Sequence, residues 1–433
     1  MKQQLDGLAD RAVPEIEHLD SLVRLLDLVR SDTARTRPEL ARLSGLGRNV
    51  VAQRVVELLD HRLLEEDGLG RSSGGRAPRE LHLRADAGVV LVAPLGATGG
   101  SVGVTDLAGR LLDSRVAEFD IADGPEAVLG RVDELLDALL DSPAVPAGAQ
   151  VYGVGIGVPG PVEFASGRPV SPPIMPGWDG YDVRGRFAGR YGAPVWVDND
   201  ANLLALGELR GGVARGEANM MCIKVGTGIG AGLVFSGRLH RGAQGCAGDI
   251  GHVAVSADTG IICRCGNVGC LEALAGGAAL ARDGAAAAVA GDSPTLAKIV
   301  QEGRRVTVGD VGRAAQHGDA TSVALMTRSG RLVGETLATL VNAFNPAMVV
   351  VGGGVADAGD LLLAAIRETV YRRSLPLATR DLRIVRSPVS RDTELLGAAF
   401  MVLDELFGPA CLRLWLPARS PAGRPEVAAA SVA

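Results

Sequence analysis

The sequence predicts an α/β fold built from two related lobes, with a small helical module in front of them. From Ala87 onward, short apolar strands alternate with helical segments, and this alternation is typical of layered α/β structure. Within that region a strand, a glycine-rich turn and a second strand occur twice, at Gly96 and at Gly226. The repetition indicates two similar lobes that face one cleft.

Length and composition restrict the class of protein. The 433 residues suffice for two or three domains, and 47% hydrophobic and 22% charged residues are ordinary for a globular chain. No apolar run reaches membrane-spanning length, and the first twenty residues are too polar for a secretory signal. Six cysteines, three of them in one short loop, argue against a disulfide framework. We therefore expect a cytoplasmic protein with no membrane partner.

Charge is distributed unevenly along the chain. Residues from Ser21 to Arg84 include 12 Arg, no Lys and nine acidic residues, which gives this segment about +3. The whole chain has a net charge of −6, so the remainder is strongly acidic. A basic N-terminal module on an acidic body indicates that this module has its own partner, such as nucleic acid.

Three helices are predicted in this basic segment. Apolar residues at helical spacing predict an amphipathic helix from about Leu19 to Val29. Thr36 is suited to cap a second helix, which ends at Gly45. A turn that contains glycine then leads into a third helix from Arg48 to Arg62, and this order is the signature of a helix-turn-helix.

The third helix carries polar side chains in its first turns, away from its apolar stripe of Val51, Val55, Leu58 and Leu59. Base-reading side chains belong at this position of a recognition helix. The residues predicted to contact bases are Arg48, Asn49, Gln53 and Arg54.

A basic loop between two short apolar strands follows the helices, in the sequence GLGRSSGGRAPRELHLR. Such a loop is typical of a wing that touches phosphate or the minor groove, so we predict phosphate contacts for Arg71, Arg76 and Arg79. The predicted DNA-binding domain spans residues 14–84. The alternative is a small helical interaction domain with an exposed basic linker.

The body is predicted to span residues 87–408. Its first glycine-turn unit precedes a helix around Pro125 to Leu140 and a buried strand in YGVGIGVPGPVE. A short strand from Val195 to Val197 ends in three polar residues at the mouth of a helix. A second glycine-turn unit and a late strand in AMVVVGGG form the second lobe. Residues 409–433 are rich in Pro, Ala and Arg without periodicity, and we predict that they form a disordered tail.

Three cysteines crowd into one loop, Cys263, Cys265 and Cys270, and His252 lies upstream at ordinary hairpin length. Three thiolates and one imidazole suit a closed tetrahedral Zn²⁺ site. The alternative is a chance cluster in a buried loop, but free cysteines rarely gather without metal or disulfide chemistry. Acidic residues bound this stretch at both ends, so it is also predicted to form one wall of a polar small-molecule pocket.

Five motifs together resemble the ROK family, which holds bacterial repressors and sugar kinases on an actin-like fold. They are GVPGPV (Gly157 to Val162), VDNDAN (Val197 to Asn202), GTGIGAGLV (Gly226 to Val234), GDIGH (Gly248 to His252) and CRCGNVGCLE (Cys263 to Glu272). The resemblance runs from about Val89 to Phe407. The N-terminal winged helix-turn-helix is what the regulator branch carries and the kinase branch lacks.

The resemblance implies a sugar site formed by Asn199, Asp200, Asp249, His252 and Glu272. Several acceptors on one wall suit a polyhydroxylated ring. In the family's kinases, the aspartate that matches Asp200 is the general base for the sugar hydroxyl. The family has Glu where this chain has Asp249, so that carboxylate is one methylene shorter. Helix capping is the alternative role for Asp198 and Asp200.

The first phosphate loop departs from the kinase pattern. Kinases of the family have Asp-x-Gly-Gly-Thr there, in which the Asp helps to hold Mg²⁺ and the amides cradle ATP phosphates. Pro94 replaces this Asp and removes a backbone N–H as well, and Gly99 replaces the family's lysine. The retained nucleotide-loop positions, which are also structural turns of the fold, are Gly96, Thr98, Gly226, Thr227, Gly228, Gly352 and Gly353.

The sequence therefore predicts a DNA-binding regulator, a repressor of carbohydrate metabolism genes, that senses a sugar or sugar derivative in a kinase-like cleft. We expect structural Zn²⁺, a duplex DNA operator and a homodimer or homotetramer, and neither ATP nor Mg²⁺. The first alternative is an active ATP-dependent, glucokinase-like sugar kinase, and Pro94 argues against it. The second is a DNA-binding protein with a ligand-free body, and the retained acidic residues argue against that.

Overall fold

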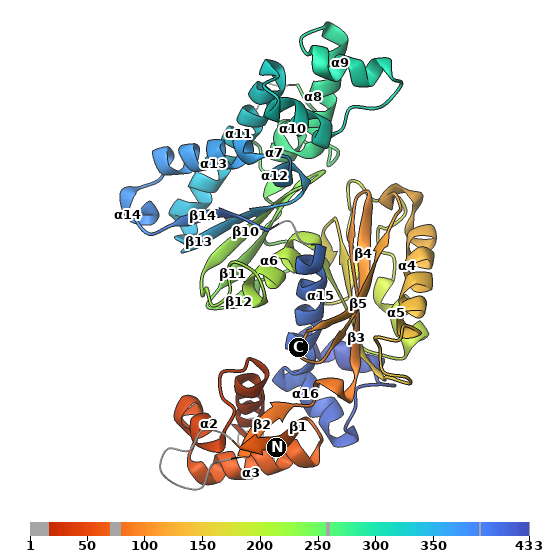
Figure 1. Ribbon diagram of the computed structural model, residues 1–433, viewed down its shortest axis with the longest axis vertical. Coiled ribbons are helices and arrows are strands. Elements are labelled where there is room, and N and C mark those ends of the chain that lie inside the picture. The colour runs from red at the N-terminus through yellow and green to blue at the C-terminus, as the bar shows by residue number, and fades with distance from the viewer. Residues whose placement is uncertain (1–16, 70–78, 257–259, 389–390, 433) are drawn as a thin grey trace, which may run out of the picture.

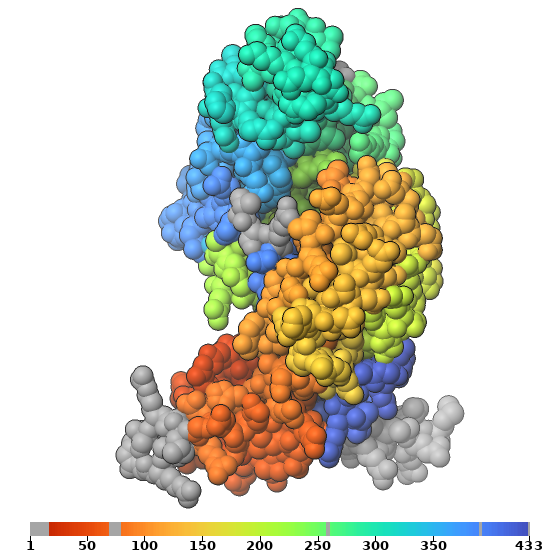
Figure 2. Space-filling view, turned by 45° about the vertical axis from the view of Figure 1, so that its right-hand side comes forward, coloured from red at the N-terminus to blue at the C-terminus, as the bar shows by residue number. Residues whose placement is uncertain are grey.

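The computed structural model describes residues 17–69, 79–256, 260–388 and 391–432. Figure 1 shows an elongated molecule with an N-terminal module at one end and two α/β lobes beyond it. The blue C-terminal helices lie between the module and the lobes. The same segments appear side by side in the space-filling view of Figure 2, where blue atoms border the orange module.

The N-terminal module has the predicted order of helices and strands. A helix at residues 17–30 is followed by α2 (Arg37–Ser44), α3 (Arg48–Asp60) and the antiparallel strands β1 (Leu64–Leu69) and β2 (Arg79–Leu83). Thr36 caps α2 in a capping box with Glu39, as its position predicts. The helix ends at Gly45, whose φ of +70° is the left-handed conformation that glycine adopts without strain. The loop with Arg71 and Arg76 lies outside the described residues.

The first lobe follows a 3-10 turn, η1 (Ala85–Ala87). Its strands are β3 (Val89–Gly96), β4 (Gly99–Asp106), β5 (Leu111–Ala117), β6 (Val151–Val158) and β9 (Val195–Asn199). The second lobe has strands β10 (Met220–Val225), β11 (Ile229–Phe235), β12 (Arg238–His240), β13 (Met348–Gly352) and β14 (Arg383–Arg386). The orders β5-β4-β3-β6-β9 and β12-β11-β10-β13-β14 are the same topology, which confirms the predicted pair of related lobes.

Helices cover both sheets. On the first lobe lie η2 (Ile121–Asp123), α4 (Pro125–Leu140) and α5 (Val183–Tyr191), with a small hairpin of β7 (Val162–Glu163) and β8 (Arg168–Pro169). On the second lie η3 (Ile250–His252), α7 (Leu271–Ala275), α8 (Gly277–Ala290), α9 (Pro294–Gln301), α10 (Val308–Gln316), α11 (Ala320–Phe344), α12 (Gly354–Asp357), α13 (Asp360–Arg373) and α14 (Pro376–Thr379). These helices bury apolar cores against the two sheets.

Two further helices are exchanged between the lobes. Helix α6 (Asp200–Arg210) follows the last strand of the first lobe but packs on β10 and β11 of the second. Helix α15 (Arg391–Leu406) follows the last strand of the second lobe but packs on β3 and β6 of the first. Each helix therefore covers the sheet of the other lobe, and the two pack against each other between the lobes (Figure 1).

The prediction of a disordered tail at residues 409–433 is wrong for the described residues 409–432, which are largely helical. Residues after Phe407 form α16 (Pro409–Trp415), η4 (Leu416–Ala418) and η5 (Pro425–Val432). Leu412, Trp415 and Val427 are fully buried in one core with the helix at residues 17–30 and with α15. The average composition of the segment did not reveal these few apolar residues, which pack between the N-terminal module and the body. Among the described residues, no single helix could span a membrane; α15 and α16 meet that length and composition only together, across a 70° bend.

Candidate functional site

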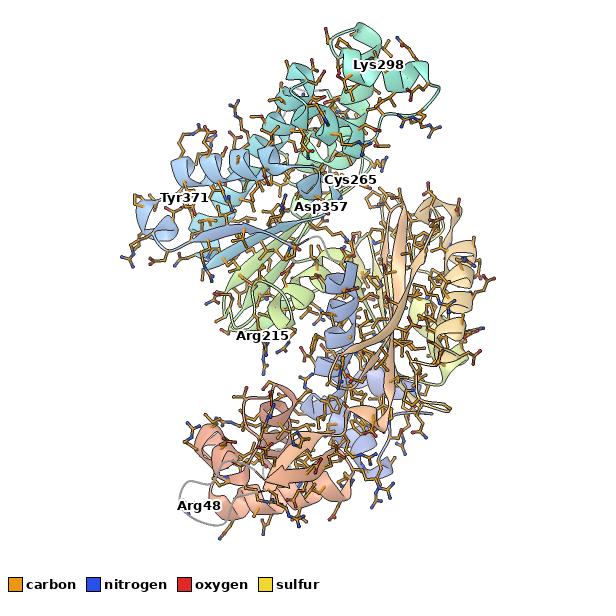
Figure 3. All side chains as sticks on the ribbon, viewed as in Figure 1. Arg48, Arg215, Cys265, Lys298, Asp357 and Tyr371 are labelled. Atoms are coloured by element: carbon orange, nitrogen blue, oxygen red, sulfur yellow. The ribbon has the colours of Figure 1, made fainter. Side chains whose placement is uncertain are left out.

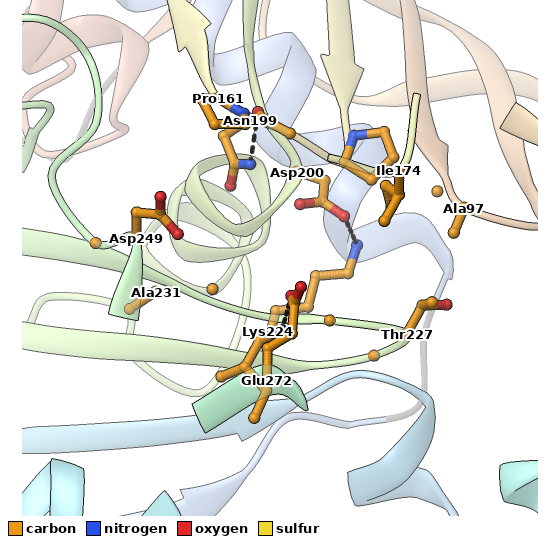
Figure 4. A pocket seen from close by; sticks show the side chains of 18 of the residues that line it. Ala97, Pro161, Ile174, Asn199, Asp200, Lys224, Thr227, Ala231, Asp249 and Glu272 are labelled. Atoms are coloured by element: carbon orange, nitrogen blue, oxygen red, sulfur yellow. Dashed lines mark hydrogen bonds and ion pairs between the residues drawn. The ribbon is translucent and has the colours of Figure 1, made fainter. Parts of the chain in front are cut away.

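A cavity of about 340 Å³ lies between the two lobes. The first lobe contributes Gly160, Pro161 and Ile174 to its wall, and the second contributes the turn between β10 and β11. All five residues of the sugar site that the resemblance implies line it: Asn199, Asp200, Asp249, His252 and Glu272. Figure 4 shows the side chains of Asp200, Asp249 and Glu272 around this space. The fold thus brings the implied site residues together.

Asn199 ends β9 and orients the start of α6. Its side-chain oxygen accepts a hydrogen bond from the Ala201 N–H at 2.9 Å, and its amide nitrogen donates to the Gly160 carbonyl at 3.0 Å. The helix cap is therefore Asn199. Capping was the alternative role considered for Asp198, and the structure assigns that residue differently: it is buried and accepts a hydrogen bond from Arg241 at 2.7 Å.

Asp200 is paired with a lysine at the floor of the cavity. The Lys224 ammonium, on β10, lies 2.9 Å from Asp200 and 2.6 Å from Glu394 of α15. Burial alone would lower the pKa of Lys224, but the two carboxylates raise it above its ordinary value, so the ammonium stays charged. Burial raises the pKa of Asp200, and Lys224 opposes that effect. One cation thus holds two carboxylates from different helices.

Sequence reasoning missed Lys224 and Glu394. A signal for the lysine was present, because only three of the 44 basic residues in the chain are Lys and this one interrupts an apolar strand. A lysine places a compact point charge on a flexible four-carbon stem. Glu394 gave no such signal, since acidic residues are common in the first turn of a helix.

Glu272, in the first turn of α7, closes the cavity against the second glycine turn. Its Oε2 accepts a hydrogen bond from the Ile229 N–H at 3.2 Å. A Cβ atom at Gly228 would lie only 2.1 Å from the same oxygen. A side chain at position 228 would therefore displace the Glu272 carboxylate from its present position.

The predicted metal ligands lie together beside the cavity. The ligand atoms of His252, Cys263, Cys265 and Cys270 are all within 4.8 Å of one another. The Sγ atoms of Cys265 and Cys270 are 3.7 Å apart, and the Cys263 Sγ lies 3.6 Å from the His252 Nδ1. A tetrahedral Zn²⁺ with ordinary bond lengths requires edges of about 3.5–3.8 Å. The donor set and spacing therefore fit this ion.

The acidity of two of these thiols depends on their surroundings. Burial opposes ionisation of Cys265, but hydrogen bonds from the Asn267 N–H and from neighbouring thiols lower its pKa to about 7. Burial raises the pKa of Cys270 to about 12. His252 turns Nδ1 toward the thiols and Nε2 toward the Asp249 carboxylate, 3.8 Å away. The imidazole therefore has one nitrogen for the metal and one for the cavity.

The phosphate side of the cleft has little charge. Gly96, Thr98 and the second glycine turn, Gly226 to Gly228, line the cavity. Pro94 lies inside β3 opposite Gly157, and no carboxylate occupies its position. Gly352 and Gly353 do not line the cavity. The φ of Gly353 is +93°, and a Cβ atom there would lie 2.6 Å from the Val225 carbonyl oxygen, so this glycine is needed by the fold itself.

The N-terminal module presents a polar face on α3. Arg48, Asn49 and Gln53 are exposed, and Arg48 lies at the outer edge of the module, away from the lobes (Figure 3). Arg54 was predicted to share this face, but its side chain is only 19% exposed and its Nε donates to the Ser21 hydroxyl at 2.8 Å. Arg54 therefore joins α3 to the helix at residues 17–30, because its helical position points inward.

The wing strands are described, but most of the wing loop is not. Arg79, at the start of β2, is 66% exposed and lies 3.4 Å from Glu66 on β1. Arg71 and Arg76 fall outside the described residues. Only one of the three predicted phosphate contacts can therefore be placed, and it is accessible.

The body has two actin-like lobes and a Cys₃His cluster, and it is joined to an N-terminal module of three helices and a two-stranded hairpin. Comparisons with known proteins identify the family that has this arrangement. The chain belongs to the ROK family, whose model matches residues 93–405. The xylose repressor of Caldicellulosiruptor bescii is 29% identical over 86% of this chain and 92% of its own length. The glucokinase of Thermotoga maritima is 31% identical over 72% of this chain and 97% of its own.

The similar solved structures also include both a transcriptional regulator and a sugar kinase. A ROK family transcriptional regulator, a homolog of the E. coli MLC protein, has a TM-score of 0.77 and 25% identity, and the match covers 94% of this chain and 99% of that one. A glucokinase from Streptomyces griseus, in complex with glucose and AMPPNP, has a TM-score of 0.64 and 30% identity over 72% of this chain and 99% of its own. Of these two matches, the one to the regulator is long enough to include the N-terminal module. The chain therefore groups with the repressor branch, as its sequence predicts.

Proposed function

We propose that this protein is a transcriptional repressor of carbohydrate metabolism genes. It binds duplex DNA through its N-terminal module and an uncharged sugar through the cavity between the lobes. The observation that carries the proposal is the union, in one chain, of an exposed polar face on α3 with a cavity lined by carboxylates. The xylose repressors among its relatives support the same function. Arg48, Asn49 and Gln53 would read bases, and the wing arginines would contact phosphates.

Charge in the cavity favours an uncharged ligand. Asp200, Asp249 and Glu272 line it, whereas Lys224 is already bound by two carboxylates and His252 turns its cavity-side Nε2 toward Asp249. Carboxylates accept hydrogen bonds from hydroxyl groups, but they repel a phosphate in a poorly solvated space. A neutral sugar such as xylose or glucose therefore fits this set of groups better than a sugar phosphate does.

Zinc has a structural role in this proposal. Zn²⁺ held by His252 and the three cysteines would fix the loop that carries Asp249 and Glu272 around the sugar. The DNA-binding domain would occupy residues 14–84 and the sugar-binding body residues 87–408, with the C-terminal segment as a support for both. A dimer or tetramer would engage paired half-sites in the operator. The protein would act in the cytoplasm, where its DNA is.

Phosphoryl transfer has less support. Relatives named glucokinase share the fold, and Asp200 stands where their general base is expected. However, the position of the metal-binding carboxylate is Pro94, the position of the family's lysine is Gly99, and Lys224 occupies one oxygen of Asp200. Phosphoryl transfer depends on positioning and on charge neutralisation, and this cleft offers little of either to a nucleotide.

One experiment tests both DNA binding and its response to a sugar. Full-length protein is used to select duplexes from a random pool, and the selected duplex is titrated with and without xylose, glucose and glucose 6-phosphate. We expect sequence-specific binding whose affinity changes with a neutral sugar and not with the phosphate. Enrichment no better than for random DNA, or a response to the sugar phosphate alone, would contradict the proposal.

A further inference from the structure

Helices α6 and α15 cross in close contact between the cavity and the N-terminal module. A Cβ atom at Gly207 would lie 1.9 Å from the Thr393 carbonyl oxygen, and one at Gly397 would lie 1.8 Å from the Leu203 carbonyl oxygen. The two backbones therefore touch without side chains between them. Because packed interiors transmit strain, a displacement of one helix is passed to the other at this crossing.

On the cavity side, Lys224 ties the first turns of both helices together. Its ammonium lies 2.9 Å from Asp200 of α6 and 2.6 Å from Glu394 of α15. One positive charge faces two negative charges in a site where none of the three side chains is more than 25% exposed. A ligand hydroxyl that bonds to Asp200 competes with Lys224 for this carboxylate and changes how strongly the lysine holds Glu394.

On the other side, Asp404 ties α15 to the N-terminal module. Its carboxylate accepts hydrogen bonds from Arg210 at the end of α6 and from Arg30 of the helix at residues 17–30, the latter at 2.7 Å. The Arg30 side chain is 10% exposed and also lies over the Phe407 ring, 5.8 Å from its centre. Glu394 and Asp404 are separated by about 15 Å along one helix. A single rigid element thus joins the cavity to the module.

A second set of contacts reaches the same end of α15. Asp198, the neighbour of the cavity residue Asn199, accepts a hydrogen bond from Arg241 at 2.7 Å. Arg241 also donates to Glu405 at 3.4 Å and lies over the Phe164 ring at 3.8 Å. Strand β9, which ends at Asn199, is therefore also linked to α15 through Arg241, next to Asp404.

We propose that α15 couples the cavity to the DNA-binding module. The contact between Lys224 and Glu394 lies at the cavity end of this helix, and the contact between Asp404 and Arg30 lies at its module end. The nature of the ligand rests on the proposed function, whereas the coupling rests on the contacts themselves. The core that the module shares with the body is apolar, and apolar packing is not directional. Buried ion pairs have demanding geometry, so the Arg30–Asp404 contact sets how the module is held.

A double-mutant cycle on DNA affinity tests the coupling without any sugar. The full-length protein, Glu394→Gln, Asp404→Asn and the double variant are each titrated with the selected duplex. We expect the change in Kd of the double variant to differ threefold or more from the product of the single changes, because both substitutions act through one helix. A smaller deviation would overturn the proposal. Thermal melting verifies that each variant is folded, and Arg30→Gln replaces Asp404→Asn if the latter does not fold.

The response to sugar provides the second measurement. In wild-type protein, the ratio of the DNA Kd with xylose or glucose to the DNA Kd without it measures the coupling. We expect this ratio to be closer to one in Asp404→Asn than in wild type. Arg372→Gln is the control, since it breaks only the exposed pair with Glu368 on α13. A wild-type ratio retained in Asp404→Asn would overturn the coupling and leave the proposed function intact. A wild-type protein that ignores every sugar would count against the proposed function, while the sugar-free cycle still decides the coupling.

Discussion

Asp200 and Lys224 are 2.9 Å apart at the floor of the cavity, and this contact restricts what the aspartate can do. The Lys224 ammonium pairs with the Oδ2 atom of Asp200 (Figure 4). A general base must accept a proton in the transition state; burial raises the pKa of Asp200, and the shared ammonium opposes that effect. The same carboxylate remains a good hydrogen-bond acceptor. The contact therefore leaves Asp200 a role as a hydrogen-bond acceptor in the cavity.

The first prediction separates binding from catalysis. Asp200→Ala should weaken binding of a neutral sugar by roughly tenfold or more, since a hydrogen bond to a charged group contributes about 1.5–3 kcal/mol. Wild-type protein should show no ATP turnover above background in a coupled assay with the same sugar. Asp381→Ala, which removes an exposed acid outside the cavity, is the control and should bind the sugar normally. Turnover at ordinary kinase rates that disappears in Asp200→Ala would favour the enzyme instead.

The second prediction concerns the metal. Purified protein should contain one Zn²⁺ per chain, and Cys265→Ser should lose it and melt at a lower temperature. Cys246→Ser removes an exposed thiol outside the ligand set and should keep the zinc. Acidification should release the ion, because thiolate ligands must be deprotonated to bind it. Elemental analysis provides the measurement, and an unchanged zinc content in Cys265→Ser would refute the assignment.

The third prediction concerns DNA. Arg79→Ala should weaken binding about equally for all sequences and reduce the salt slope by about one unit, as expected for a phosphate contact. Gln53→Ala should instead change sequence preference, with a cost of about 1–3 kcal/mol at one base pair. Arg54→Ala should lower stability through loss of its contact with Ser21, without a change in preference. Competition titrations over a range of salt distinguish these outcomes, and a changed sequence preference in Arg54→Ala would return that residue to the DNA-binding face.

Local signals predicted much of this fold. Thr36 and Gly45 bound α2 because capping and left-handed backbone are properties of a few neighbouring residues. The metal ligands were predictable for a similar reason, since three of the four lie in one loop. The glycine turns at Gly96 and Gly226 indicated paired lobes because each turn joins two adjacent strands.

Contacts between distant segments were not predictable in the same way. Lys224 and Glu394 meet because α15 crosses into the other lobe, and no spacing in the sequence encodes that exchange. The inward direction of Arg54 depends on where the helix at residues 17–30 packs. The C-terminal segment was misjudged because its apolar residues are few, although Leu412, Trp415 and Val427 are fully buried. The average composition of a segment does not show whether a single residue, such as Trp415, is buried and keeps the segment ordered.

The last prediction tests that anchor. The Trp415 side chain is fully buried, and its indole N–H donates to the Leu406 carbonyl at 2.9 Å. Its ring lies 6.2 Å from that of Tyr152 and 5.9 Å from that of Phe407, so it packs between the body and α15. Trp415→Ala should destabilise the protein by about 3–5 kcal/mol, because it leaves a cavity and an unpaired carbonyl group.

The effect should spread to the N-terminal module, since Trp415 shares a core with Leu22 and Leu26. Limited proteolysis should therefore cleave the module of Trp415→Ala faster than that of wild type, and denaturant unfolding should begin at lower concentration. Leu414→Ala is the matched control: its side chain is 38% exposed, so the loss should stay below about 1 kcal/mol. If Trp415→Ala behaved like Leu414→Ala in both assays, the C-terminal segment would not support the module. Its burial would then be a consequence of the fold and not a cause of its stability.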